Sequence, residues 1–300
     1  MTRYRRGTGL DSEACFRVFE AAIDDLGRRT GTIANTTASE TWAWDIRQPL
    51  YDHLAATADE WWIAENDAGR VVGYARSMER DGTRELTEFF VHPAAQAGGI
   101  GRELLARAFR ADGVKHRSII ATTDVRAVNR YLREGLAGQL PLAGLEAVPR
   151  AVALETDLVR EPIVATERTL EALGAIDRAV LGFRRDVDHI WLATERSGWL
   201  YRRAGEAVAY GYHPVRPSWG GPYAALEAAD LPVLLADAES AAFEAGHATV
   251  SFDVALIAQT AIDHLLGRGF RVDPFLMLFF TDGPVDGLDR YVLTSPPFFL

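Results

Sequence analysis

The chain has 300 residues, 48% of them hydrophobic and 25% charged, and its formal net charge is −10 at pH 7. That length is ample for a buried core and favours two domains of ordinary size. The acidic balance argues against a nucleic-acid-binding protein, because affinity for a phosphate backbone needs a basic surface. No run of about eighteen uncharged apolar residues occurs, so no membrane span is expected.

Cys15 is the only cysteine, which excludes an intramolecular disulfide and any metal site built from several cysteines. Phe16, Phe19 and Ile23 follow it at helical spacing, so a packed thiol is favoured over a nucleophile. The N-terminus is basic and then polar, unlike a secretory signal. We therefore expect a cytoplasmic protein, a monomer or a homodimer, with no resident metal.

The first half of the sequence predicts four helices and four strands, which indicates a mixed α/β protein. Two of the strands are joined by the turn 66–70, which has the composition of a β-hairpin turn. The predicted elements are, in chain order, a helix over 12–28, a helix over 41–56, strands over 61–65, 71–75 and 85–91, a helix over 99–111, a strand over 118–122 and a helix over 125–134.

The second half repeats this order of elements at a spacing of roughly 140 residues, which indicates duplication of one domain. We place the boundary near 148–160 and predict domains over 1–150 and 151–300. The predicted elements are helices over 167–180 and 186–194, strands over 199–201 and 208–210, a helix over 230–245, a strand over 248–252 and a helix that ends at Gly267.

A glycine-rich turn, 96–101, lies between the strand over 85–91 and the following helix. Unpaired N–H groups and the positive end of the helix dipole converge at such a turn, and the missing Cβ atoms let an anion approach the backbone. The turn has neither the lysine of a Walker loop nor the spacing of the Rossmann fingerprint. We expect a pyrophosphate there, although an isolated glycine cluster of this kind is more often a flexible loop.

Gln96, Gly99 and Gly101, after a strand that ends in Val91-His92-Pro93, resemble the signature of the GNAT superfamily of N-acetyltransferases. The next helix carries further family positions, namely Ala127, Tyr131, Gly135 and Leu136. The resemblance implies two tandem GNAT-like domains, each a central mixed, mostly antiparallel sheet flanked by helices. It also implies acetyl-CoA as cosubstrate.

In that family the signature strand is splayed from its neighbour, so that its backbone pairs with the pantetheine arm of the cofactor. The resemblance therefore implies a cofactor-binding set of Phe90, Val91, Gln96, Ala97, Gly98, Gly99, Ile100, Gly101 and Arg102. Two residues depart from the family pattern. Gly98 replaces a commonly basic residue, and Asp124 stands where an asparagine often contacts the cofactor arm.

Acyl transfer to an amine needs a base for the amine and an acid for the leaving thiolate. Tyr131 resembles the general acid of the family, with simple aromatic packing as the alternative. Glu88 and Glu85 are the candidate bases, and we favour Glu88 slightly. Strand alternation places them on opposite faces unless a bulge intervenes. A further hypothesis is that the C-terminal carboxylate, on Leu300, acts as the base.

An acceptor pocket in this family is lined by the first two helices and nearby strands. The candidates are Trp42, Trp44, Asp45, Tyr51, Trp61 and Trp62, which suit an amine through cation–π and ionic contacts; amphipathic helix core is an equally good explanation. The sequence does not identify the acceptor.

The second half lacks the glycine signature and has Glu227 and Asp230 at the corresponding place, while Leu265 stands where the first half has Tyr131. We expect it to be non-catalytic. The predicted function is transfer of the acetyl group of acetyl-CoA to a primary amine of a small molecule or peptide. The alternative is a non-enzymatic acyl-CoA sensor or scaffold.

Overall fold

The structure, a computed structural model, describes residues 2–31, 43–215, 220–294 and 297. The chain forms two compact units, each of which we describe by itself. Unit 1 comprises Met1–Ala137 and Phe280–Gly283, and unit 2 comprises Gly138–Phe279 and Pro284–Leu300. Residues 138–150, which the sequence assigned to the first domain, are therefore part of unit 2, and a four-residue segment of the second half is part of unit 1.

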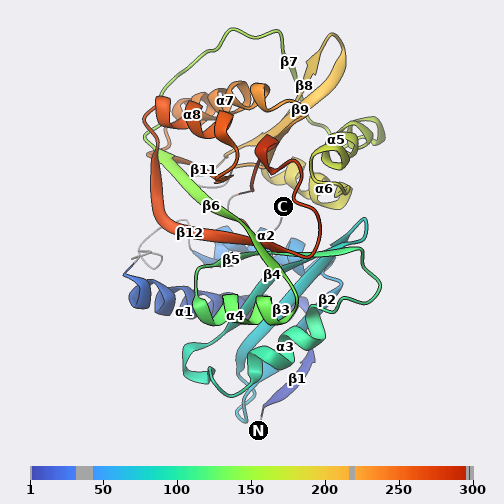
Figure 1. Cartoon of the computed structure of the whole chain (residues 1–300), viewed down its shortest axis with the longest axis vertical. Helices are drawn as coiled ribbons and strands as arrows, with labels where there is room; N and C mark the ends of the chain where they lie inside the picture. The colour runs from blue at the N-terminus through green and yellow to red at the C-terminus, as the bar shows by residue number, and fades with distance from the viewer. Residues whose placement is uncertain (1, 32–42, 216–219, 295–296, 298–300) are drawn as a thin grey trace. The chain divides into compact units, whose positions relative to one another are not determined.

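Unit 1 has helices on both faces of a sheet (Figure 1). The helices are α1 (Ser12–Thr30), α2 (Trp44–Thr57), α3 (Ile100–Ala108) and α4 (Val125–Arg133). The strand order is β1 (Arg3–Arg6), β2 (Glu60–Glu65), β3 (Val71–Arg80), β4 (Thr83–Val91), β5 (His116–Thr122) and then the end of β12 (Arg271–Thr281).

The apolar face of α1 explains why this helix covers the sheet of unit 1. Cys15, Phe16 and Phe19 are buried, as the helical spacing predicted. The Phe19 ring packs edge-on against Phe90 of β4, with 5.0 Å between ring centroids. On the opposite face, the hydroxyl of Ser77 donates to the backbone oxygen of Ala108 in α3. Helices α1 and α3 thus pack on opposite faces of the same two strands.

Unit 2 repeats this arrangement with its own helices. They are α5 (Glu167–Val180), α6 (Asp186–Glu195), α7 (Leu231–Glu244) and α8 (Gln259–Gly267). Its strand order is β12, β6 (Ala137–Ala147), β11 (Val250–Ala255), β13 (Tyr291–Val292), β10 (Tyr223–Ala225), β9 (Glu206–His213), β8 (Ser197–Arg203) and β7 (Val159–Pro162).

The mixed α/β fold with a mostly antiparallel sheet is confirmed, and β4 and β5 form a parallel pair. Sequence reasoning missed the short strands β1, β7, β10 and β13. It also missed β6 and β12, because each contains a proline, Pro141 or Pro274, and proline usually interrupts a strand. In the described part of the chain, none of the helices is both long enough and apolar enough to cross a membrane.

Candidate active site

Strands β4 and β5 of unit 1 separate part of the way along their length. They pair in parallel register only from Thr83 to Glu85, which face His116 to Ser118. From Leu86 onward, β4 still pairs with β3 along one edge, but its other edge no longer pairs with β5. The remaining β4 residues, which include the predicted Phe90 and Val91, therefore present one backbone edge away from β3. An extended ligand arm can pair with such an edge as an added strand.

The chain leaves β4 through a short 3-10 turn and enters α3 through the predicted glycine loop. Ala97 and Gly99 adopt left-handed backbone conformations, with φ of 69° and 81°. Gly99 is the N-cap of α3, and the first bond of the helix runs from the N–H of Glu103 to its carbonyl oxygen. Among the described residues, no acceptor takes up the six consecutive N–H groups of 97–102.

Those six N–H groups are the donors that an anion needs at a helix N-terminus. Gly98 leaves open space, because a Cβ there would come no closer than 3.9 Å to the oxygen of Ala95. Gly101 is tighter, since a Cβ there would lie 3.0 Å from the ring of Phe89. Ile100 is buried, and Arg102 is exposed beside Glu103. The loop therefore fits a pyrophosphate on its open side.

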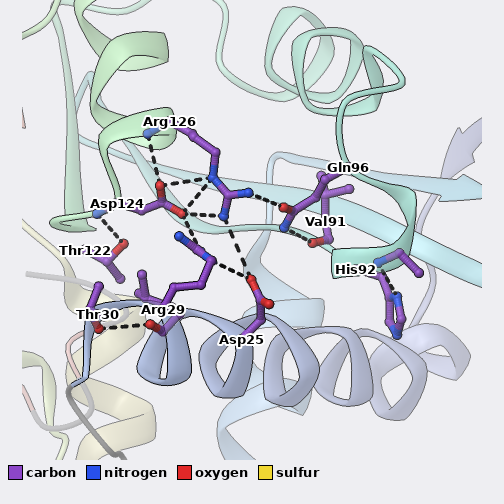
Figure 2. Close-up of polar contacts among 11 residues, drawn as sticks. Asp25, Arg29, Thr30, Val91, His92, Gln96, Thr122, Asp124 and Arg126 are labelled. Atoms are coloured by element: carbon purple, nitrogen blue, oxygen red, sulfur yellow. Dashed lines mark hydrogen bonds and ion pairs between the residues drawn. The ribbon is translucent and has the colours of Figure 1, made fainter.

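Gln96 fixes the loop to the strand exit, as Figure 2 shows. Its Nε2 donates to the oxygen of Val91 at 3.0 Å, and its Oε1 accepts from Arg126 of α4 at 2.6 Å. Arg126 also donates to Asp124, the N-cap of α4, at 2.9 Å. The signature glutamine thus joins the end of β4 to the beginning of α4.

Two arginines hold the carboxylate of Asp124 (Figure 2). Arg29 of α1 donates to it at 2.9 Å and also pairs with Asp25. Burial acts to raise the pKa of Asp124, but the hydrogen bonds from Arg126 and Arg29 outweigh it and lower the pKa to about 2. At the place where the family often has an asparagine, this chain therefore has a permanently charged carboxylate.

Arg130 is a functional candidate that sequence reasoning missed. It is half-buried in α4, and its guanidinium carbon lies 3.4 Å from the point where a Cβ of Gly101 would stand. Its side chain forms no hydrogen bond or ion pair with the described residues. Arg126 and Arg130 are four residues apart and hence share a helix face. That spacing was the available sequence signal.

A β-bulge in β4 changes the expectation for the two glutamates. Glu85 faces Met78 on β3, Glu88 faces Arg76, and the register shifts by one residue between them. Met78 and Arg76 are two residues apart and point to one face, so Glu85 and Glu88 also share that face. The bulge, which the sequence left open, thus brings both candidate bases to the side of the sheet that α1 covers.

Glu88 lies in a buried polar cluster. Its Oε1 accepts from the hydroxyl of Tyr74 at 2.7 Å, and its Oε2 lies 3.3 Å from Nε of Arg76. Both side chains of this ion pair are fully buried. Oε2 accepts no hydrogen bond from the described residues. A buried carboxylate oxygen without a hydrogen-bond donor is unusual in a folded protein.

Tyr131 lies in α4 with its ring between two phenylalanines. The ring centroid is 6.4 Å from that of Phe89 and 5.6 Å from that of Phe280. Burial raises the pKa of Tyr131 well above its ordinary value, and the charge of Asp124 adds to the effect. Its hydroxyl forms no hydrogen bond with the described residues.

The predicted acceptor pocket is assembled only in part. Three of the candidates, Trp44, Tyr51 and Trp61, lie on the α1 side of the sheet. The guanidinium carbon of Arg76 lies 3.9 Å from the ring centroid of Trp61 and 5.7 Å from that of Tyr51. Two other candidates lie apart from this group. Asp45 is exposed, and Trp62 packs with Arg6 and Arg107 on the opposite face. Trp42, and the candidate base at Leu300, lie outside the described residues.

Unit 2 differs from unit 1 at the corresponding helix start. Asp230 precedes α7, accepts from Arg203 at 2.7 Å and is nearly buried. Pro232 occupies the first turn of α7 and has no N–H. Leu265, on α8, is buried in the hydrophobic core. In the described part of the chain, no three His, Cys, Asp or Glu residues form a group that could hold a metal ion.

Comparison with protein-family models matches residues 57–135 to "Acetyltransferase (GNAT) domain". This segment contains the splayed strand, the glycine loop and Tyr131. Comparison with the curated proteins gives no match.

Solved structures resemble the chain over nearly its whole length. A putative acetyltransferase from Pyrococcus horikoshii has a TM-score of 0.69 at 15% identity and covers 97% of this chain and 92% of its own. A GCN5-related N-acetyltransferase from Sphaerobacter thermophilus has a TM-score of 0.62 at 14% identity, with coverages of 95% and 97%.

A tandem GNAT protein from the clavulanic acid biosynthesis pathway has a TM-score of 0.55 at 14% identity, and covers 95% of this chain and 100% of its own. Identities this low establish the shared fold alone. The two comparisons agree: residues 57–135 match the GNAT acetyltransferase domain model, and the chain as a whole shares the fold of solved structures that include a tandem GNAT protein.

Proposed function

We propose that unit 1 binds acetyl-CoA and transfers its acetyl group directly to a primary amine of a small molecule or peptide. The observation that carries the proposal is the row of six N–H groups at 97–102, none of which has an acceptor in the described chain. A pyrophosphate supplies acceptors for such donors, and charge-assisted hydrogen bonds of this kind are each worth about 1.5–3 kcal/mol.

Two further features support acetyl-CoA as the ligand. The β4 edge beyond Glu85 has no β5 partner and can pair with the amide groups of a pantetheine arm. Arg130, which forms no ion pair with the described residues, places its guanidinium beside the loop. The predicted set from Phe90 to Arg102 then divides between the two parts of the ligand: Phe90 and Val91 flank the arm, and residues 96–102 surround the pyrophosphate.

Glu88 is the base in this proposal. An ammonium group must first release a proton to solvent to expose its lone pair, and the nitrogen must lose a second proton once it has attacked the thioester carbonyl. Oε2 of Glu88, which accepts no hydrogen bond from the described residues, can take this second proton. Nε of Arg76 lies 3.3 Å from the same oxygen. As the C–N bond forms and the C–S bond breaks, Glu88 takes the proton that the nitrogen releases. Glu85, on the same face, is the alternative base.

Tyr131 is the proposed acid, which gives its proton to the departing CoA thiolate. Its raised pKa keeps the phenol protonated at neutral pH. The reaction then leaves an amide and a free thiol, and both side chains exchange protons with water before the next cycle.

We further propose that unit 2 does not bind CoA. Asp230 places a negative charge at the start of α7, and Pro232 removes one of the N–H donors that a phosphate needs. Leu265, at the place of Tyr131, has no proton to donate. We therefore place neither a CoA site nor an acid in unit 2.

Thiol release from acetyl-CoA over a panel of primary amines tests the proposal, with longer acyl-CoA esters in parallel. Y131F separates an enzyme from a non-enzymatic acyl-CoA sensor. We expect it to lose roughly tenfold or more in turnover while its affinity for CoA is unchanged. CoA binding without thiol release from any amine would favour the sensor instead.

A further inference from the structure

A four-residue segment from the end of the chain completes unit 1 beside the proposed acid. Phe280–Gly283 belongs to this unit although about 140 residues separate it from the rest. The N–H of Asp282 donates to the oxygen of Arg117 in β5 at 3.2 Å, and the N–H of Arg117 donates back to the Asp282 carboxylate at 2.6 Å. The hydroxyl of Thr281 also donates to the oxygen of Arg117.

Phe280 is the residue of this segment that contacts Tyr131. Their ring centroids are 5.6 Å apart, closer than those of Tyr131 and Phe89. No described group hydrogen-bonds the Tyr131 hydroxyl, so among the described contacts it is ring packing that orients the phenol. One of the two rings that supply this packing comes from the second half of the chain.

Arg117 carries the contact on to the helix that holds Tyr131. Its Nε donates to the Asp282 carboxylate at 2.8 Å, and its Nη2 donates to the oxygen of Glu134, the C-cap of α4, at 2.8 Å. The segment thus holds Tyr131 in two ways, through the Phe280 ring and through the end of α4. Gly283 packs closely against His116, since a Cβ on Gly283 would lie 2.6 Å from Cγ of His116.

We propose that Phe280 is a positioning residue for Tyr131, and that Asp282 anchors it there. The inference rests on the proposed role of Tyr131 as the acid. If the inference is correct, a residue from the second half, which the sequence predicts to be non-catalytic, contributes to the reaction of unit 1. A change at Phe280 should alter the orientation of the phenol and the rate of the chemical step, and should leave the binding of CoA at the glycine loop intact.

F280L keeps an apolar side chain in place but removes the flat ring. F279L is the matched control, because Phe279 is equally buried and alternation turns it to the other face of the strand. Fluorine NMR of the full chain labelled with 3-fluorotyrosine reports on the phenol directly, since Y131F identifies the resonance of Tyr131. Steady-state turnover is measured with acetyl-CoA and the best amine of the panel.

We expect the Tyr131 resonance to move in F280L and in D282N but not in F279L. F280L should lower kcat about fivefold with an unchanged KM for acetyl-CoA, and should lower it no further in the Y131F background. An unmoved resonance, or equal losses of kcat with and without the tyrosine, would overturn the inference alone. Wild-type turnover in Y131F would instead refute the acid itself and, with it, the proposed function of this residue.

Discussion

Replacing Gly99 by alanine tests the loop conformation on which the proposed cofactor site depends. Gly99 has a φ of 81°, and a Cβ there would meet no atom within 4 Å. The substitution therefore creates no clash, and its cost is the strain of an alanine in the left-handed region, about 1–2 kcal/mol. Gly98→Ala is the matched control, because Gly98 does not have a positive φ and its Cβ also points into open space.

The strain in Gly99→Ala appears either as lost stability or as lost affinity. If the loop relaxes in the free protein, the affinity for CoA falls by a factor of about 5–30, the equivalent of 1–2 kcal/mol. If the loop holds its shape, the same free energy is lost from unfolding. Calorimetric titration with CoA and urea unfolding of both variants measure the two parts. The reasoning is refuted if Gly99→Ala matches Gly98→Ala in both measurements.

Three further predictions concern the charged groups around the loop and strand. When turnover is normalised to the amount of protein that binds CoA, E88Q should lower it about a hundredfold and E85Q much less. A larger loss in E85Q than in E88Q would assign the base to Glu85. Arg130→Gln should weaken CoA binding about tenfold in calorimetry, and Arg133→Gln, which changes an exposed neighbour on α4, should leave it unchanged. The pKa of Asp124 is lowered from an ordinary value of 3.8 to about 2 in the folded protein. Its charge therefore contributes fully to the free energy of unfolding above pH 3.8, and this contribution is lost as the pH falls through 2. After discounting for partial exposure, D124N should be about 1 kcal/mol less stable than wild type at pH 6 in urea unfolding, with the difference vanishing near pH 2; a gap that persists there would contradict the pKa.

The chain order of the elements in each half followed from local patterns. The helix over 167–180 and the hairpins have clear periodicity and turn residues, so they were predicted within a few residues. The glycine loop was visible for the same reason, because its function is carried by consecutive backbone groups. Local sequence suffices for such features.

Features that depend on distant partners were not predictable in this way. Strands β6 and β12 contain Pro141 and Pro274, and their pairing is set by tertiary contacts that local propensity does not encode. The bulge between Glu85 and Glu88 depends on how β4 aligns with β3. The packing of Phe280 on Tyr131 brings together residues that are about 150 positions apart in the sequence. The Arg76 and Glu88 pair is likewise a contact between two strands.

We propose that the chain has one site for CoA, at the glycine loop of unit 1. Calorimetric titration of CoA into wild type and Gly98→Asp tests it most directly, because Gly98 has space for a side chain and an ordinary φ, so the aspartate adds a negative charge with little strain. We predict one CoA per wild-type chain, and an affinity at least about tenfold weaker in the variant. Two CoA molecules per chain, or equal binding by both proteins, would contradict the account.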